Sequence, residues 1–293
     1  MPKYWLLIAL PAAALAQEPP RDVFGTLPRD GSRPVATRAE ILSAWQSRQG
    51  AIRTARFAWV EQQTHPKGWL ANPRFPERER LAIPALREDH SYSVAKTLTI
   101  DGDKMRYTFE LDRAEEPRLG VGRHYRYVSV FDGRVGKVYL TSMINTPPPT
   151  TLSVTTNEDA QNVDTRPIMM ALRALHPVMG HLLVERAVPN FGRRFYKGRS
   201  TMIIEERHDP SGWKTSLWIE PERGFLVSRY RVAFEQHIMV DIDIDYTNDA
   251  RWGWIPTGWR VSELLADGSV RLVSTARVTS YSINTAIDAS EFH

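Results

Sequence analysis

The sequence predicts an α+β fold: a single curved antiparallel β-sheet, an unclosed barrel, with covering helices. Three observations lead to this prediction. The last third of the chain, from Trp213 to Phe292, alternates apolar and polar residues with the period of two that is typical of half-buried strands. Tight turns such as Asp267-Gly268 join these strands into a meander, and a meander of long strands curls because strands twist. Two stretches of helical periodicity, residues 37–50 and 167–183, are available to cover the apolar face.

Residues 1–16 have the features of a cleaved signal peptide. Lys3 gives a positive start, the following run is apolar, and Ala14-Leu15-Ala16 forms an A-x-A cleavage pattern. The apolar run is shorter than the roughly 20 residues that a membrane-spanning helix needs. We therefore expect a periplasmic or secreted protein with no transmembrane segment after cleavage. The expected division of the mature chain is a flexible leader, residues 17–36, and a single half-barrel domain, residues 37–293.

The composition excludes several classes of protein. The chain has 293 residues, of which 42% are hydrophobic, so it can bury a large core without disulfides, and it contains no cysteine. Its formal net charge of +4 is small, and no basic-aromatic RNA-binding motif is present, so we expect no nucleic-acid partner. Gly120-Val121-Gly122 lacks the third glycine of a dinucleotide site, and the chain has no G-x-S-x-G motif.

The predicted domain opens with an amphipathic helix. Thr37-Arg38-Ala39-Glu40 is a capping box, in which a hydroxyl and a carboxylate three residues later satisfy the first backbone amides. Trp45 lies on the apolar face of this helix, and Gly50 is expected to end it.

Strands and one irregular excursion follow. Residues 52–63 predict the first strand, with Phe57, Trp59 and Glu61 on one face. Residues 64–89 carry several prolines and predict a long excursion, of a kind that tends to be functional or mobile. Hairpins are predicted around Asp101-Gly102 and Asp132-Gly133.

The middle of the chain predicts a break in the sheet and then helix. Pro147-Pro148-Pro149 and its flanking threonines are expected to form an extended, polyproline-like segment. The helical region is expected to be capped by Asp164 or Thr165, with Pro167 in its first turn. It carries two apolar patches: Ile168, Met169, Leu172 and Leu175, then Val178, Met179, Leu182 and Leu183.

Within the meander, residues 226–235 predict one covered and one wet face. Arg229 and Arg231 are expected to face solvent. The residues expected on the covered face are Leu226, Ser228, Tyr230, Val232 and Phe234.

Three sequence features together resemble the periplasmic lipoprotein-carrier (LolA/LolB-like) superfamily. The first is export followed by a helix and the strand opening at residues 52–57. The second is residues 218–226, where Glu220-Pro221-Glu222-Arg223-Gly224 separates two strands. The third is Trp254-Ile255-Pro256, followed by a strand and ending in Ser282-Ile283-Asn284 and Phe292. The resemblance implies an unclosed antiparallel barrel over a hydrophobic cavity, with helices as a lid. Carriers of this kind shield the acyl chains of lipoproteins, and some relatives sense envelope stress.

The predicted ligand site lies between the concave sheet face and the helices. Methionines cover irregular shapes adaptably, and an acyl chain in such a cavity gains about 0.8 kcal/mol per buried methylene. An alternative interpretation is that the same side chains fill the core completely. The candidate cavity and lid residues are Trp45, Trp59, Met169, Leu172, Met179, Leu182, Tyr230 and Phe234.

Other constellations have both a chemical and a structural interpretation. Asp241, Asp243 and Asp245 share a strand face, so they fit a hard-cation site, an acid/base pair or a solvated outer face. His176 and His181 lack the helical spacing and third ligand of a metal site.

Two further groups of candidate binding residues consist of tryptophans and of arginines. Trp252, Trp254 and Trp259 could form a sugar platform or pack between strands. Arg193 and Arg194 fit an anionic head group or an exposed basic turn.

The resulting functional hypothesis is an exported, non-enzymatic binding protein that holds a lipid or lipidated partner in an apolar cavity under a helical lid. The sequence predicts no catalytic residue, no metal ligand and no cofactor. The alternative is an envelope regulatory or scaffolding module that binds another protein through a sheet edge or residues 64–89. A hydrolase that uses Asp241, Asp243 or Asp245 is a third hypothesis.

Overall fold

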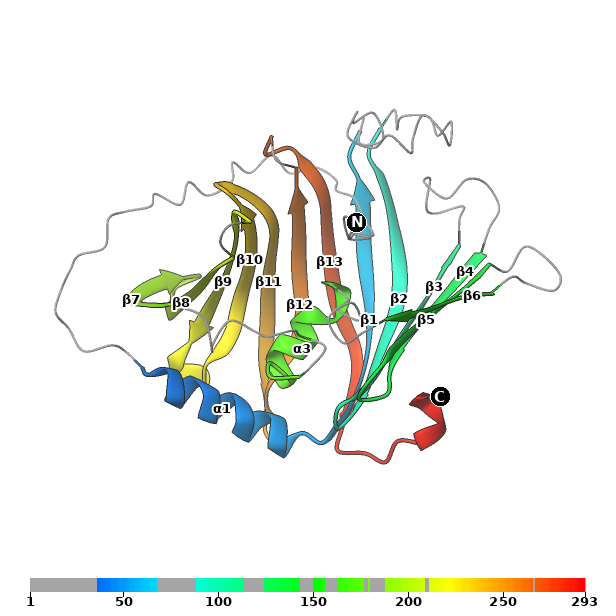
Figure 1. The fold of residues 1–293 in the computed structure, drawn as a ribbon, viewed down its shortest axis with the longest axis horizontal. Helices are drawn as coiled ribbons and strands as arrows, with labels where there is room; N and C mark the ends of the chain where they lie inside the picture. Colours follow the sequence, from blue (N-terminus) through cyan, green and yellow to red (C-terminus); the bar gives the residue numbers. More distant parts are fainter. Residues whose placement is uncertain are drawn as a thin grey trace.

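One antiparallel sheet dominates the structure, a computed structural model (Figure 1). The structure describes residues 36–67, 88–112, 124–142, 150–155, 163–176, 179, 188–208, 211–265 and 267–292. The sheet has 13 strands in the order β6-β5-β4-β3-β2-β1-β13-β12-β11-β10-β9-β8-β7. Every neighbouring pair is antiparallel, and the first strand pairs with the last at the centre of the sheet.

The strands and helices have the following bounds. The N-terminal half contributes β1 (Thr54–His65), β2 (His90–Asp101), β3 (Lys104–Asp112), β4 (His124–Phe131), β5 (Gly136–Ser142) and β6 (Thr150–Thr155). The C-terminal half contributes β7 (Val188–Tyr196), β8 (Arg199–His208), β9 (Trp213–Glu220), β10 (Leu226–Phe234), β11 (His237–Asp249), β12 (Gly253–Leu264) and β13 (Val270–Ile283). The helices are α1 (Arg38–Ala51) and α3 (Arg166–Leu172), and the short 3-10 turns are η3 (Val163–Thr165), η5 (Pro221–Arg223) and η6 (Ala289–Phe292).

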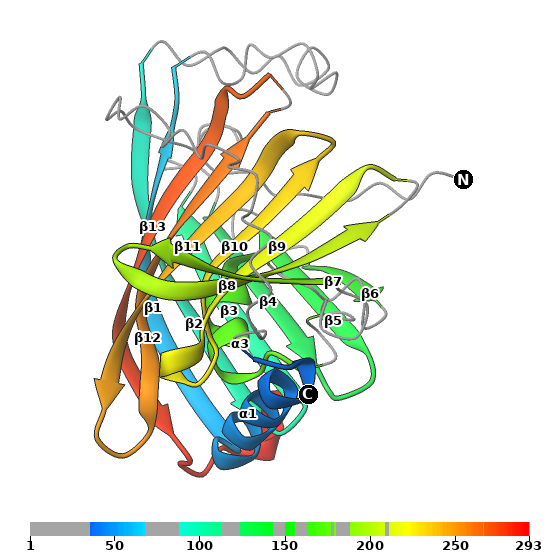
Figure 2. The same ribbon diagram turned by 90° about the vertical axis from the view of Figure 1, so that its left-hand side faces the viewer.

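The sheet curves without closing. In Figure 2 both edge strands, β6 and β7, lie to the right of the central strands β1 and β13, on the same side as α3. Among the described strands none joins β6 to β7, so the sheet is an open half-barrel. The predicted fold class, an α+β curved antiparallel sheet with covering helices, is confirmed. We call the side that holds α3 the concave face and the opposite side the convex face.

Parts of the three sequence features that suggested the resemblance contact one another around α1. The capping box forms, because Glu40 N donates to Thr37 Oγ1 at 3.2 Å and Thr37 N donates to Glu40 Oε2 at 2.6 Å. At the η5 turn, Trp45 Nε1 donates to Phe225 O at 2.8 Å, which anchors α1 on that turn. Gly224 has a left-handed φ of 67°, which favours glycine there.

Asn284, from the third feature, closes the junction between α1 and β1. Its Oδ1 accepts from Arg53 N at 2.7 Å, and its Nδ2 donates to Ala51 O at 2.8 Å. The backbone of Asn284 is left-handed at φ 53°, a conformation that asparagine adopts more readily than most residues. The helix continues through Gly50 to Ala51, so the prediction that Gly50 ends it was wrong by one residue.

The predicted faces of β1 and the predicted hairpins are confirmed. Phe57, Trp59 and Glu61 are each at most 2% exposed, whereas Val60 between them is 39% exposed. Gly102 and Gly133 have positive φ angles of 56° and 99° in their hairpin turns.

The predicted faces of β10 need correction. The strand is buried on both faces, and its register against β9 shifts between Val227 and Arg229. This bulge inserts Ser228 as an extra residue, so the alternation changes phase and Val227, not Leu226, joins Tyr230 in the main core. Arg229 and Arg231 are only 7% and 8% exposed, so the second face is not wet.

The sheet resumes at Thr150, directly after the triple proline, so the predicted interruption of the sheet is shorter than expected. The helix that follows is also shorter than the predicted residues 167–183. Thr150 and the residues after it form the edge strand β6 instead of continuing a polyproline-like segment. Arg193 and Arg194 lie in strand β7, not in a basic turn. The helix α3 ends at Leu172.

Several predictions fall outside the described residues: the signal peptide and leader, the triple proline itself, His181, Leu182 and all but the ends of the excursion at residues 64–89. Within the part of the chain that the structure describes, no helix is long and apolar enough to span a membrane.

Candidate ligand-binding site

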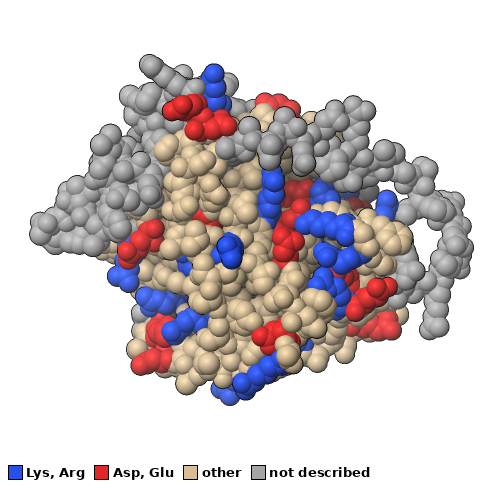
Figure 3. Space-filling view, turned by 180° about the vertical axis from the view of Figure 1, so that it is seen from behind, with Lys and Arg blue, Asp and Glu red and all other residues tan. Residues whose placement is uncertain are grey.

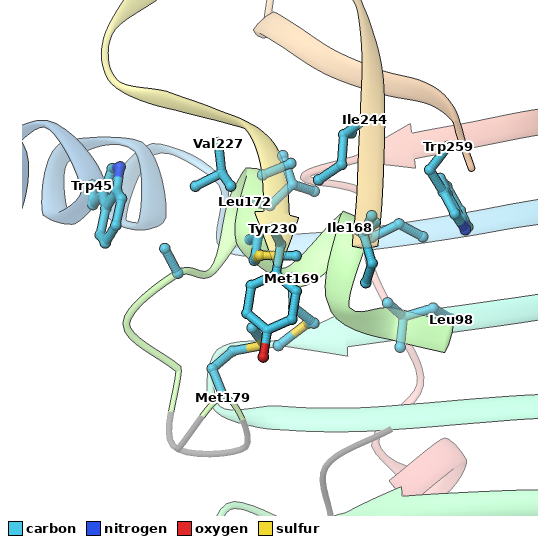
Figure 4. Close-up of a cluster of buried hydrophobic side chains, with 14 of the residues drawn as sticks. Trp45, Leu98, Ile168, Met169, Leu172, Met179, Val227, Tyr230, Ile244 and Trp259 are labelled. Carbon is cyan, nitrogen blue, oxygen red and sulfur yellow. The ribbon is translucent and has the colours of Figure 1, made fainter. Parts of the chain in front are cut away.

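Most of the predicted cavity residues come together in one apolar cluster on the concave face (Figure 4). Met179 and Tyr230 lie beside the helix that carries Met169 and Leu172. The cluster residues that the sequence predicted are Trp45, Trp59, Met169, Leu172, Met179 and Tyr230, each at most 9% exposed. Phe234 lies apart from them and packs against Trp213, with ring centroids 5.1 Å apart.

The helix α3 occupies the centre of this cluster. It packs against β10, β12 and α1, and each residue from Pro167 to Leu172 is buried. Ile168, Met169 and Met170 are 0% exposed, so the helix has apolar contacts on every side. In this conformation the middle of the concave face is therefore occupied by the protein's own helix, which is the second of the two interpretations left open by the sequence.

A buried ionic network holds the N-terminal end of the α3 segment. Asp164 Oδ2, in η3, accepts from Lys96 Nζ at 2.7 Å and from Tyr107 OH at 2.6 Å. Lys96 Nζ also donates to Glu61 Oε2 at 2.9 Å, and Glu61 Oε1 accepts from Gln63 Nε2 at 2.5 Å. Lys96 and Glu61 are each 2% exposed, so this network is part of the interior.

The electrostatics keep Lys96 charged and Tyr107 protonated. Burial alone would lower the pKa of Lys96, but the carboxylates of Asp164 and Glu61 outweigh it and the pKa is raised. Burial, followed by the charge of Asp164, raises the pKa of Tyr107 well above its usual value. Both groups therefore remain hydrogen-bond donors to Asp164 at neutral pH.

Arginines hold the C-terminal end of α3. Arg173 Nη1 donates to Gln49 O at 2.6 Å and its Nη2 donates to Arg53 O at 2.5 Å. Gln49 O lies in the last turn of α1, where helix carbonyls lack intrahelical partners. Arg53 O lies just beyond the helix and also accepts from Gly102 N at 3.0 Å. Burial lowers the pKa of Arg173 from its usual value. The segment from Asp164 to Arg173 thus has an apolar middle and a charged contact at each end.

The sequence interpretation missed this network, although part of its signal was present. Glu61 was placed on the same face as Phe57 and Trp59, which is a buried face. A carboxylate on a buried strand face needs a cationic or hydrogen-bonding partner. The identity of that partner depends on register, because Lys96 pairs with Trp59 and reaches Glu61 diagonally.

On the convex face, the three aspartates of β11 are engaged by basic and tyrosine side chains. Asp241 accepts from Arg229 at 2.7 Å and from Arg231 at 2.9 Å, and both guanidinium groups stack on Trp218. Asp243 accepts from the hydroxyl of Tyr196. Lys197 Nζ lies 3.5 Å from Asp245 Oδ1. The interpretation as a solvated outer face therefore holds for Asp245, which is largely exposed, whereas Asp241 and Asp243 are partly buried.

The surface of the convex face carries both signs of charge side by side, without an extended patch of one sign (Figure 3). Burial, and then the neighbouring charge of Asp245, raises the pKa of Asp243 to about 6. Among the described residues, no group of His, Cys, Asp and Glu is arranged to hold a metal ion.

The three predicted tryptophans do not share one surface. Trp259 is 2% exposed and contacts Trp59 edge to face in the core, with ring centroids 5.4 Å apart. Trp254 carries the guanidinium of Arg223 at 3.4 Å from its ring centroid. His176 follows α3 and packs against Phe131, and burial lowers its pKa to about 4.

A cavity of about 250 Å³ lies outside the concave face, where the β7–β8 hairpin meets η5. Its arginines flank one buried carboxylate: Glu220, 1% exposed, accepts from Arg199 at 2.9 Å and from Arg223 at 3.0 Å. Because these charges already neutralise one another, the cavity is not an open anion site.

No protein-family model matches this chain, and no curated protein matches it in sequence. Among solved structures, the chain is similar to a putative outer membrane lipoprotein-sorting protein domain from Vibrio parahaemolyticus, with 10% identity, a TM-score of 0.48, and coverage of 87% of this chain and 97% of that one. It is also similar to a DUF1329 family protein from Desulfovibrio piger, with 9% identity, a TM-score of 0.47, and coverage of 89% and 98%. A third similar structure is a LolA superfamily protein from Nitrosomonas europaea, with 10% identity, a TM-score of 0.47, and coverage of 88% and 98%.

Proposed function

We propose that this chain is an exported, non-enzymatic binding protein that holds an acyl chain of a lipid or lipidated partner on its concave face. The ligand would occupy the place that α3 fills in this structure. The observation that carries the proposal is the construction of the α3 segment: its middle is apolar on every side, and its polar contacts lie at its two ends.

The chemistry of the cluster supports an acyl ligand. Met169, Met170 and Met179 surround the position with unbranched side chains, which adapt to irregular shapes. An acyl chain would replace the apolar contacts of the helix with apolar contacts. The hydroxyls of Tyr107 and Tyr230 would lose their partners Asp164 and Arg166 in the exchange. The Lys96–Glu61 ion pair persists without Asp164, so release of the segment does not strip Lys96 of every carboxylate.

Approximate free energies of burial favour the exchange of the helix for a long acyl chain. Exposing the large side chains Ile168, Met169, Met170 and Leu172 costs on the order of 2 kcal/mol each, or about 8 kcal/mol together. An acyl chain of about sixteen carbons gains on the order of 12 kcal/mol when it is fully buried. On the apolar contribution alone, a long acyl chain outweighs the helix and a short one does not. The contacts of Asp164 and Arg173 add to the cost of releasing the segment.

Equilibrium binding of a fluorescent fatty acid to the purified protein tests the proposal. We expect uptake of a long-chain probe and about tenfold tighter binding by Asp164→Ala, because the variant removes one end contact and raises the population of the competent state. A short-chain probe should bind neither protein.

Glu110→Ala is the matched control, since Glu110 of β3 forms an exposed ion pair with Arg126 of β4. It should bind the probe as the wild type does. Native mass spectrometry of protein purified from its own envelope should show co-purified lipid. The proposal fails if neither the wild type nor Asp164→Ala takes up a long-chain probe and no lipid co-purifies.

A further inference from the structure

The two edges of the sheet differ in how they are protected. A free edge presents unpaired backbone groups, and proteins usually block it with charge, proline or a bulge. The edge strand β7 contains Pro189 and two arginines, and its register against β8 is interrupted between Asn190 and Arg194. The opposite edge strand, β6, has the sequence TTLSVT, with no charge, no proline and no glycine, and its pairing with β5 is regular.

The exposed side chains of β6 are apolar. Leu152 is 54% exposed and Val154 is 65% exposed, and they are among the most exposed large apolar side chains of the described residues. Both point to the convex face, beside Tyr139 and Lys137 of β5, which pair with them directly. Within the part of the chain that the structure describes, no strand pairs with the outer edge of β6, and one face of the strand is exposed.

We propose that β6 pairs antiparallel with β6 of a second copy of this chain, so that two half-barrels share one continuous sheet. The choice of a second copy rests on two features of the strand. It carries no charge, so two copies meet without like-charge repulsion. Its exposed apolar residues are also symmetric about Ser153, so a twofold axis at Ser153 places Leu152 opposite the second copy's Val154.

This register extends the rows of side chains that the sheet already contains. On the convex face, Tyr139 and Leu152 of one copy would continue into Val154 and Lys137 of the second. The twofold axis repeats the same row in reverse, which is the isologous arrangement of most homodimers. The inference does not depend on lipid binding, because it uses the convex side of an edge strand and the proposed ligand lies on the concave face.

A strand pair of this length buries less surface than a stable dimer needs, so the association should be weak and reversible. Sedimentation velocity over a wide protein concentration range should show a monomer–dimer equilibrium. Val154→Glu should weaken dimerisation about tenfold or more, because a charge then faces an apolar residue across the interface. The same glutamate lies across from Lys137 within its own chain, so the monomer is not destabilised.

Val270→Glu is the matched control, since Val270 is 42% exposed on the strand β13. It should dimerise as the wild type does. Equal loss of dimer in both glutamate variants would contradict the inference, because it would show an effect of charge and not of the β6 edge.

A cysteine scan tests the register directly, since the chain contains no cysteine. Residues opposite each other in an antiparallel pair have Cα atoms about 4.5–5.5 Å apart, which permits a disulfide. Ser153→Cys should therefore form a covalent dimer on mild oxidation, at least about tenfold faster than Val270→Cys. The inference is overturned if the wild type stays monomeric at millimolar concentration, or if the two cysteine variants cross-link at the same rate.

Discussion

The two faces of the sheet are covered in different ways. On the convex face of β9, β10 and β11, the strands cover themselves: Arg229 and Arg231 of β10 lie over Trp218 and are paired with Asp241 of the neighbouring strand. On the concave face, the cover is a separate segment, α3, whose apolar residues fill the space between β10, β12 and α1.

The difference teaches which contacts can be exchanged. In this part of the convex face, the covering side chains belong to the strands they cover, so they cannot leave without unfolding the sheet. Elsewhere on that face the C-terminal turn η6 covers the sheet near Arg56 and Arg106. The α3 segment can leave while every strand pairing stays intact, because it contributes no strand to the sheet. In the proposed function, the concave face is the one on which a ligand replaces protein, and the following predictions test that contrast.

The largest effect is expected from Lys96→Met. The substitution leaves the buried carboxylate of Glu61 and the partly buried carboxylate of Asp164 without their cation, which should reduce the free energy of unfolding by about 3–5 kcal/mol. Lys214→Met is the matched control, because it breaks an ion pair with Glu205 at the partly exposed surface, and it should cost less than about 1 kcal/mol. Urea unfolding measures both. Equal losses would mean that the network at the end of α3 contributes nothing specific.

Leu172→Ala should cost about 3 kcal/mol, because a fully buried leucine leaves a cavity between α3 and its neighbours. The same variant should bind the long-chain probe more tightly, since the displaced helix has lost apolar contacts. Leu152→Ala, on the exposed edge strand, should change stability by less than about 0.5 kcal/mol and leave probe binding unchanged. A Leu172→Ala variant that is destabilised but binds the probe more weakly would argue that α3 forms part of the ligand site.

His176→Phe should change the pH dependence of stability on the concave side. The pKa of His176 is lowered from 6.5 to about 4 by burial, so the folded state favours the neutral ring. The neutral ring of His176 contributes fully to the free energy of unfolding above pH 6.5. This contribution falls by about 2–3 kcal/mol as the pH decreases from 6.5 to 4. Phenylalanine keeps the ring against Phe131 and removes the titration. Urea midpoints at pH 7 and pH 4.5 should therefore differ less for the variant than for the wild type.

The smallest effect is expected from Asp243→Asn on the convex face. This substitution should raise the free energy of unfolding, whereas Lys96→Met and Leu172→Ala lower it. The pKa of Asp243 is raised to about 6, so the folded state favours the protonated carboxyl. The contribution of this carboxyl to the free energy of unfolding is therefore lost as the pH rises from about 4 to 6. Asparagine keeps an acceptor for the Tyr196 hydroxyl. The variant should be more stable than the wild type at pH 7 by about 1 kcal/mol and equal to it at pH 4. A gain that persists at pH 4 would show a cause other than titration.

The sheet was predictable because its signals are local. The alternation of residues 238–246 and the turns at Gly102, Gly133 and Gly268 specify strands and hairpins without reference to distant residues. Its curvature followed from the length of the strands. The bulge at Ser228 was not predictable from the alternation, because one extra residue changes the phase without changing the pattern of residue types.

The candidate site was predictable as a list of apolar residues, but not as an arrangement. Helical spacing identified Met169 and Leu172, yet spacing does not say whether a covering helix leaves a space beneath it. The charged contacts at Asp164 and Arg173 depend on which strands are neighbours and in what register. Such long-range pairings carry no local signal.

The pairing of β1 with β13 also determines the order in which the sheet can assemble. Ala55 pairs with Ile283, so the two halves of the sheet are joined by residues from opposite ends of the domain. Contacts between residues so far apart in sequence form slowly, since a long loop must close before they gain any stability. During synthesis, each half can begin to form hairpins, but the central seam must wait until residues 270–283 have emerged. The half-barrel is therefore expected to complete its fold only after nearly the whole chain has been released.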